Sequence, residues 1–231
     1  MAHYYNLKYN VVNNKMTYET NHHIHITTAT VAQLFKLPQQ MIDYLWERID
    51  IAKKRQICHK RDLAGNISHS YILKDPQNLV VKNLYKIVND LGSNPKMFKF
   101  IQKEIARIYD KTSYKGILTP QLDNMWVNFQ KKGEFQPVHD HSGIFSFVIW
   151  MDIPYHSKDE SKLPFAYSNA DPPPGGNFTF VYPIELSRKI IEHVIEMSPE
   201  MNGHCCFFPS DLSHQVYPFY TSDKDRISIS G

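Results

Sequence analysis

The chain has 231 residues, of which 42% are hydrophobic and 21% are charged, and its formal net charge is +3. This length suits one domain with a real core, and the small, scattered positive charge gives no strong signal for a nucleic-acid partner. No segment reaches the roughly 18 consecutive apolar residues of a membrane span, and the N-terminus lacks a signal-peptide pattern. Three cysteines, two of them adjacent, exclude a disulfide framework. We therefore expect a cytoplasmic protein without a membrane partner.

Apolar residues in the N-terminal half recur at helical spacing. Phe98, Ile101 and Ile105 fall on one face, and Asn94 and Pro95 supply an N-cap and a first helical residue before them. The elements predicted in this half are a strand pair around Tyr4–Val12 and His23–Thr28, and helices within residues 41–51, 79–91 and 95–108.

From Asn124 onward the pattern changes to short β-prone runs that are separated by turn residues. Asp171–Gly176 is a loop on any interpretation, because it contains three prolines followed by two glycines. Residues 188–197 fit a helix or a strand equally well. The remaining runs predict strands at Met125–Phe129, His139–His141, Phe145–Met151, Asn177–Tyr182, His204–Phe208, His214–Pro218 and Arg226–Ser230.

Short antiparallel strands accompanied by helices predict an α+β fold with a jelly-roll core of two facing sheets. We expect the N-terminal helices to pack on one of these sheets. The chain is then a single domain over residues 1–231. Residues 1–123 form a mainly helical support, and residues 124–231 form the β core.

The segment from Gln136 to His141 is the strongest local signal for chemistry. Alternate side chains of a strand point to the same face, so His139 and His141 would project together, about 6–7 Å apart, while Asp140 projects away. Two imidazoles on one face can chelate a metal ion, because histidine is the commonest metal ligand. The same pattern is typical of an exposed polar strand end, and both interpretations stay open.

Two later segments add groups of matching chemistry. His214 begins a strand after a Pro-Ser turn, where a barrel can bring it beside the first histidine pair. Arg226 and Ser228 share one face of the last strand. If that face is internal, the buried guanidinium needs an anion, and a dicarboxylate suits its planar fork. If that face is external, the strand is a polar edge.

Taken together, these segments resemble the Fe(II)/2-oxoglutarate-dependent oxygenases. The closest resemblance is to a branch related to prolyl hydroxylases that occurs in bacteria and phages, which implies the cytoplasm of a bacterium or of a phage-infected host. The segment Asp62–Ile67 also resembles the N-terminal part of the phage-type members. The residues that carry the ordered motifs of this branch are Trp126, Asn128, Gly133, His139, His141, Gly203, Phe208-Pro209-Ser210, His214 and Arg226–Ser230.

The resemblance implies a double-stranded β-helix core and a site for two small partners. Fe(II) would be held by His139, His141 and His214, and 2-oxoglutarate would be bound by Arg226 and Ser228, with Asn128 lining its pocket. The implied reaction couples decarboxylation of 2-oxoglutarate to hydroxylation of an unidentified substrate, either a small molecule or a protein side chain such as proline.

The sequence departs from the superfamily at one ligand position. Most members have a carboxylate two residues after the first histidine, where this chain has His141. Strand alternation favours His141, and Asp140 is the alternative ligand if the strand bulges.

Two other functions stay open from the residues alone. One is a cupin-like dioxygenase that uses three histidines without 2-oxoglutarate, and the other is a non-enzymatic, metal-containing binding or virion module. In the oxygenase interpretation, residues 172–176 and 158–162 are candidates for a mobile lid.

Overall fold

The computed structural model describes residues 23–25, 31–92, 95–109, 121–166, 175–183 and 189–231. Within these ranges the helices are α1 (Gln39–Arg55), α2 (Leu79–Gly92), α3 (Pro95–Tyr109) and α4 (Ser157–Glu160). The strands are β1 (His23–His25), β2 (Val31–Lys36), β3 (His69–Ile72), β4 (Trp126–Gln130), β5 (Gln136–His139), β6 (Phe145–Asp152), β7 (Phe178–Pro183), β8 (Ile190–Ile195), β9 (His204–Pro209), β10 (His214–Val216) and β11 (Arg226–Ser230).

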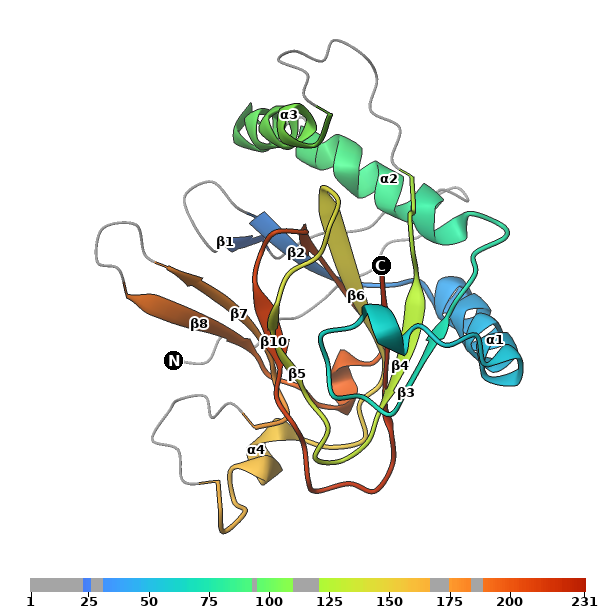
Figure 1. Cartoon of the computed structure of the whole chain (residues 1–231), viewed down its shortest axis with the longest axis vertical. Helices are drawn as coiled ribbons and strands as arrows, with labels where there is room; N and C mark the ends of the chain where they lie inside the picture. The colour runs from blue at the N-terminus through green and yellow to red at the C-terminus, as the bar shows by residue number, and fades with distance from the viewer. Residues whose placement is uncertain (1–22, 26–30, 93–94, 110–120, 167–174, 184–188) are drawn as a thin grey trace.

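The strands form two antiparallel sheets. The larger sheet has the order β1-β2-β9-β6-β11-β4-β3, and the smaller has the order β5-β10-β7-β8. Figure 1 shows α1 beside the larger sheet and β7 and β8 at the far side of the molecule. Strands distant in sequence are therefore neighbours, and the last strand, β11, lies between β4 and β6.

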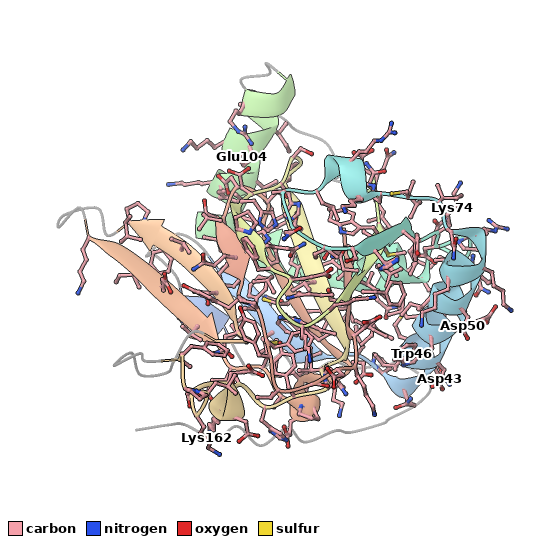
Figure 2. The ribbon with its side chains drawn as sticks, turned by 60° about the horizontal axis from the view of Figure 1, so that its bottom comes forward. Asp43, Trp46, Asp50, Lys74, Glu104 and Lys162 are labelled. Carbon is pink, nitrogen blue, oxygen red and sulfur yellow. The ribbon has the colours of Figure 1, made fainter. Side chains whose placement is uncertain are left out.

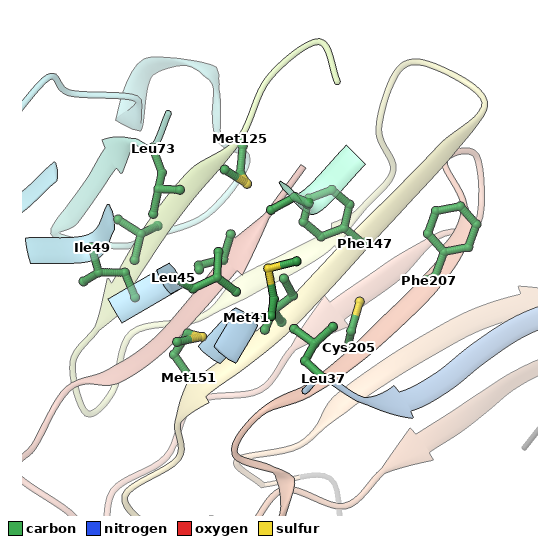
Figure 3. Packing of buried hydrophobic residues seen from close by; sticks show 14 of the residues in the cluster. Leu37, Met41, Leu45, Ile49, Leu73, Met125, Phe147, Met151, Cys205 and Phe207 are labelled. Carbon is green, nitrogen blue, oxygen red and sulfur yellow. The ribbon is translucent and has the colours of Figure 1, made fainter. Parts of the chain in front are cut away.

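One hydrophobic core joins the helices to the larger sheet. Leu45 and Ile49 of α1 are fully buried and belong to the same cluster as Phe147 and Met151 of β6. Figure 3 shows these α1 side chains directed at the strands, together with Leu37 and neighbouring core residues. Burying a large aliphatic side chain contributes about 1.5–3 kcal/mol, so α1 is fixed on the sheet by apolar packing.

The opposite side of α1 is polar. Asp43 and Asp50, seven residues apart, are exposed, and Figure 2 shows them on the outer side of the helix. The helix ends at Arg55, the last of three basic residues that complement the helix dipole, and its C-cap residue Gln56 has a left-handed φ of 50°.

A second core lies between the two sheets. Trp150 and Phe208 of the larger sheet are fully buried with Phe178 and Phe180 of the smaller one. The molecule thus has a helical layer, a large sheet and a small sheet. The prediction of a mixed fold with antiparallel sheets is confirmed.

Several predicted elements differ in detail. The ambiguous residues 188–197 contain the strand β8, since pairing with β7 satisfies their backbone groups. The prediction of a strand at His139–His141 is wrong in its bounds, because β5 runs from Gln136 to His139. Residues 4–12 lie outside the described residues. None of the described helices is long and apolar enough to cross a membrane.

Candidate metal centre

Two neighbouring strands and one loop bring three histidines together. His139 on β5 lies directly opposite His214 on β10. His141 follows the end of β5, and its backbone N–H donates to the carbonyl of Ser210, 2.8 Å away. One nitrogen of each imidazole lies within 4.8 Å of the others. The loop contact, and not strand alternation, therefore positions His141.

Backbone carbonyls determine which ring nitrogen is available in two of these histidines. Nδ1 of His139 lies 2.7 Å from the carbonyl of Pro137, and Nδ1 of His214 lies 3.0 Å from that of Leu212. A carbonyl only accepts, so each Nδ1 carries the proton and each Nε2 keeps a lone pair. Two such lone pairs that point inward are suited to one cation.

His141 completes the cluster with its Nε2 atom. This atom lies 3.2 Å from Nε2 of His214. Burial lowers the pKa of His141 to about 4, with a smaller effect from His139, and lowers the pKa of His139 and, strongly, that of His214. All three imidazoles are therefore neutral near pH 7, which is the state that binds a metal.

Aromatic rings surround the cluster. The rings of Phe178 and Phe208 lie 5.3 and 5.0 Å from that of His214, and the indole of Trp126 lies 5.7 Å from His141, measured between ring centroids. This packing limits the access of water to the inner side of the cluster.

Asp140 does not belong to this group of ligand atoms. Its side chain is exposed, and the cluster that could hold a metal consists of the three histidines. Asp140 acts on His139 and His141 as a nearby negative charge, which opposes the larger effect of burial on their pKa values. The chemistry of the donor set, three neutral imidazoles, fits a borderline divalent metal such as Fe(II).

Arg226 is buried, with 2% of its surface exposed. Its Nη1 donates to the hydroxyl of Tyr155, at 3.1 Å, and to the carbonyl of Gly176, at 3.4 Å. Its Nε has no hydrogen-bond partner among the described residues, and no described carboxylate lies within ion-pair distance of it. A buried guanidinium without an anionic partner is energetically unfavourable, so this side chain is suited to binding the carboxylate of a ligand.

The three histidines, Arg226 and Ser228 line one pocket, to which no acidic side chain of the described residues contributes. Asn128 lies opposite Ser228 across β4 and β11, and its buried Oδ1 has no described partner. It is not among the residues that line the pocket, although Trp126 and Gln130 on the same face of β4 are.

Sequence reasoning missed Tyr155. Its hydroxyl donates to Gly176 at 2.5 Å and accepts from Arg226, and its ring stacks on Phe219 at 4.4 Å. No motif marked this residue, because its role depends on a contact between segments distant in sequence, the bend after β6 and the strand β11.

The candidate lid segment at residues 158–162 is anchored in part. Glu160, at the end of α4, is buried and accepts hydrogen bonds from the backbone of Tyr220 at 2.8 Å and of Thr221 at 3.0 Å. Residues 172–174 of the other candidate lid lie outside the described part of the chain.

Comparison with protein families gives one match. Residues 124–231 match the model of the family described as "Putative 2OG-Fe(II) oxygenase". No curated protein matches the chain.

Solved structures that are similar to this chain include two prolyl hydroxylases and one oxygenase. A prolyl-4-hydroxylase from Pseudomonas putida is 14% identical, with a TM-score of 0.47, over 87% of this chain and 90% of that one. A Trichoplax adhaerens prolyl hydroxylase, in complex with a peptide of the hypoxia inducible factor, is 14% identical, with a TM-score of 0.47, over 86% and 81%. A 2OG-Fe(II) oxygenase family protein from Burkholderia pseudomallei is 16% identical, with a TM-score of 0.40, over 85% and 83%.

Proposed function

We propose that this chain, whose residues 124–231 match the 2OG-Fe(II) oxygenase family, is such an oxygenase and hydroxylates a substrate held beside His139, His141 and His214. The cofactor is Fe(II) and the co-substrate is 2-oxoglutarate. The observation that carries the proposal is that three neutral imidazoles and one unpaired buried guanidinium line the same pocket.

His139, His141 and His214 would hold the iron. When bound, Fe(II) and 2-oxoglutarate supply the oxidising chemistry, in which decarboxylation of the co-substrate drives hydroxylation of a C–H bond. The Pro137 and Leu212 carbonyls keep the Nε2 atoms of His139 and His214 free to bind. Phe178 and Phe208 shield this end of the pocket from water.

Arg226 would bind the distal carboxylate of 2-oxoglutarate, with Ser228 as a further donor. The guanidinium is already oriented by Tyr155 and Gly176, so little conformational entropy is lost when the ligand binds. Asn128 would support the same wall from β4. A dicarboxylate also supplies the negative charge that the lining residues lack.

We further propose that residues 1–231 form a single domain with a double-stranded β-helix core. In support, α1 and the larger sheet share one hydrophobic cluster. The cupin-like enzyme without 2-oxoglutarate and the non-enzymatic module are set aside, because the matched family is one of 2OG-Fe(II) oxygenases.

Anaerobic titration of the chain with Fe(II), followed by 2-oxoglutarate, tests the proposal. We expect one iron per chain and a charge-transfer absorption band when 2-oxoglutarate is added. Arg226→Gln should bind iron normally but lose the band at the same 2-oxoglutarate concentration. Iron binding without any effect of 2-oxoglutarate on the unmodified chain would contradict the proposed function.

A further inference from the structure

The segment Asp62–Ile67, which the iron site does not use, contributes Ile67 to the candidate metal-binding pocket. The backbone N–H of Asn66 donates to the carbonyl of Phe135 at 2.9 Å, just before β5. The backbone N–H of Ser68 donates to Glu134 at 3.0 Å. Ile67 is 1% exposed and lines the pocket. This segment is thus fixed along the connection between β4 and β5.

Gly65 in this segment makes room for one pocket side chain. A Cβ atom at Gly65 would lie 2.7 Å from Cγ of Gln136, closer than real side chains approach. Gln136 in turn lines the pocket, and its side chain is partly exposed. The absence of a side chain at Gly65 therefore allows Gln136 to lie where it does.

Trp126 adds a second polar group to the same pocket. Its indole is 7% exposed, yet Nε1 has no partner in the described part of the chain. The ring is held against His59, with ring centroids 4.7 Å apart. A buried N–H without a hydrogen-bond partner is unfavourable, so Trp126 is suited to a ligand that accepts a hydrogen bond.

The charges around the pocket limit which substrates can lie against Gln136 and Trp126, the two residues that form the substrate wall. Arg226 is the one permanent cation among the described residues that line the pocket, and the proposed function commits it to 2-oxoglutarate. A cationic substrate would meet the metal ion without a compensating carboxylate. An anionic substrate would find no second cation. The polar groups at Trp126 and Gln136 are neutral, and they match a neutral carbonyl.

We propose that Gln136 and Trp126 are specificity-determining residues that select a substrate with an uncharged amide, as in a peptide chain. The indole N–H and the amide of Gln136 donate to carbonyl oxygens of the substrate, and the Gln136 oxygen can accept an amide N–H. This inference rests on the proposed function, and it adds a substrate class that the iron and 2-oxoglutarate sites do not determine.

Matched small probes test the substrate class. Each probe is an amino acid in three forms: capped at both ends as an N-acetyl N-methylamide, with a free carboxylate, or with a free amine. Proline, leucine and lysine serve as side chains. Under air, with Fe(II) and 2-oxoglutarate, we expect the capped forms of at least one amino acid to stimulate succinate release about tenfold more than either charged form. Equal or greater stimulation by the carboxylate or amine forms would overturn the proposal.

Two variants test whether the substrate wall, Gln136 and Trp126, causes the preference for capped probes. Gln136→Glu replaces the neutral amide by a charge, and Gly65→Ala displaces Gln136 without changing its chemistry. Each should reduce the stimulation by capped probes about tenfold, whereas Gln102→Glu on the exposed surface of α3 should not. Unchanged stimulation in both wall variants would overturn the assignment.

Calorimetric titration of each manganese-loaded variant with 2-oxoglutarate separates the two hypotheses. If the unmodified, manganese-loaded chain does not bind 2-oxoglutarate, the proposed function is wrong. Normal 2-oxoglutarate binding without preference for capped probes would mean that only the substrate class is wrong.

Discussion

His214 has the most constrained environment of the three histidines. It is buried, its Nδ1 is fixed by the Leu212 carbonyl, and aromatic rings surround its imidazole. No other arrangement of the ring could keep this hydrogen bond and still direct Nε2 at His141. The position is therefore specific for histidine.

His214→Ala should abolish metal binding. Two remaining imidazoles make a weak site, and the loss should exceed the roughly 10–100-fold that removal of an outer partner of a ligand costs. Metal content after equilibration with Fe(II) and desalting measures the effect. His156→Ala, at an exposed histidine away from the cluster, is the control and should retain one ion per chain. Full metal content in His214→Ala would contradict this site.

In the proposed function, Tyr155 acts on the binding of 2-oxoglutarate through Arg226. Tyr155→Phe keeps the ring stacked on Phe219 but removes the hydroxyl that accepts from the guanidinium. We expect 2-oxoglutarate to bind about 2–13-fold more weakly, which corresponds to the loss of one hydrogen bond of about 0.5–1.5 kcal/mol. Calorimetry on the manganese-loaded chain measures this affinity. Tyr220→Phe, at an exposed tyrosine, should leave it unchanged.

At the scale of elements, the sequence predicted the helices and strands whose hydrophobic pattern can be seen within one continuous segment. Three long helices and the strands that became β4, β6, β7, β9, β10 and β11 were predicted from apolar spacing and turn residues. β2 was not, because its residues Val31–Lys36 become a strand through pairing with β9, far along the chain. Tertiary pairing of this kind leaves no local signal.

The candidate site shows the same limit. His139, His214 and Arg226 were found because ordered motifs mark them. The position of His141 was inferred from strand alternation, but the structure holds it through the carbonyl of Ser210 after β5 has ended. Tyr155 was not predicted, because its role is to bind the guanidinium of Arg226, which lies beside it only in the folded chain.

The packing of α1 on the larger sheet gives a prediction about stability. Leu45 is fully buried in the cluster between α1 and the sheet, so Leu45→Ala leaves a cavity there. We expect the free energy of unfolding to fall by about 2–5 kcal/mol, measured by urea denaturation of the metal-free chain. Glu47→Ala, on the exposed side of α1, should cost less than about 0.5 kcal/mol. Equal effects would show that α1 is not packed as described.

At the scale of the whole molecule, the proposed metal ligands and Arg226 reduce the stability of the metal-free fold. The fold buries His214 and Arg226, and buries His139 and His141 in part, at the cost of removing these groups from water. The metal and co-substrate offset this cost when they bind, so the metal-free chain is the form in which it can be measured.

Buried and partly buried histidines make the stability of the metal-free chain depend on pH. In the folded chain burial lowers the pKa of His139, His141 and His214, that of His141 to about 4, while each titrates near 6.5 when unfolded. Between these values the unfolded chain binds more protons than the folded one. The free energy of unfolding is therefore complete above about pH 6.5 and falls as the pH decreases toward 4.

Each histidine that stays neutral in the folded chain contributes a slope of up to about 1.4 kcal/mol per pH unit in this range. Urea denaturation of the metal-free chain between pH 7 and 5 measures the total. His214→Asn removes one contributor, so its slope should be smaller by about that amount. His193 and His204, whose pKa values burial also lowers, are present in both proteins and cancel in the difference. An identical slope in the variant would mean that His214 is not buried as a neutral imidazole in the metal-free fold.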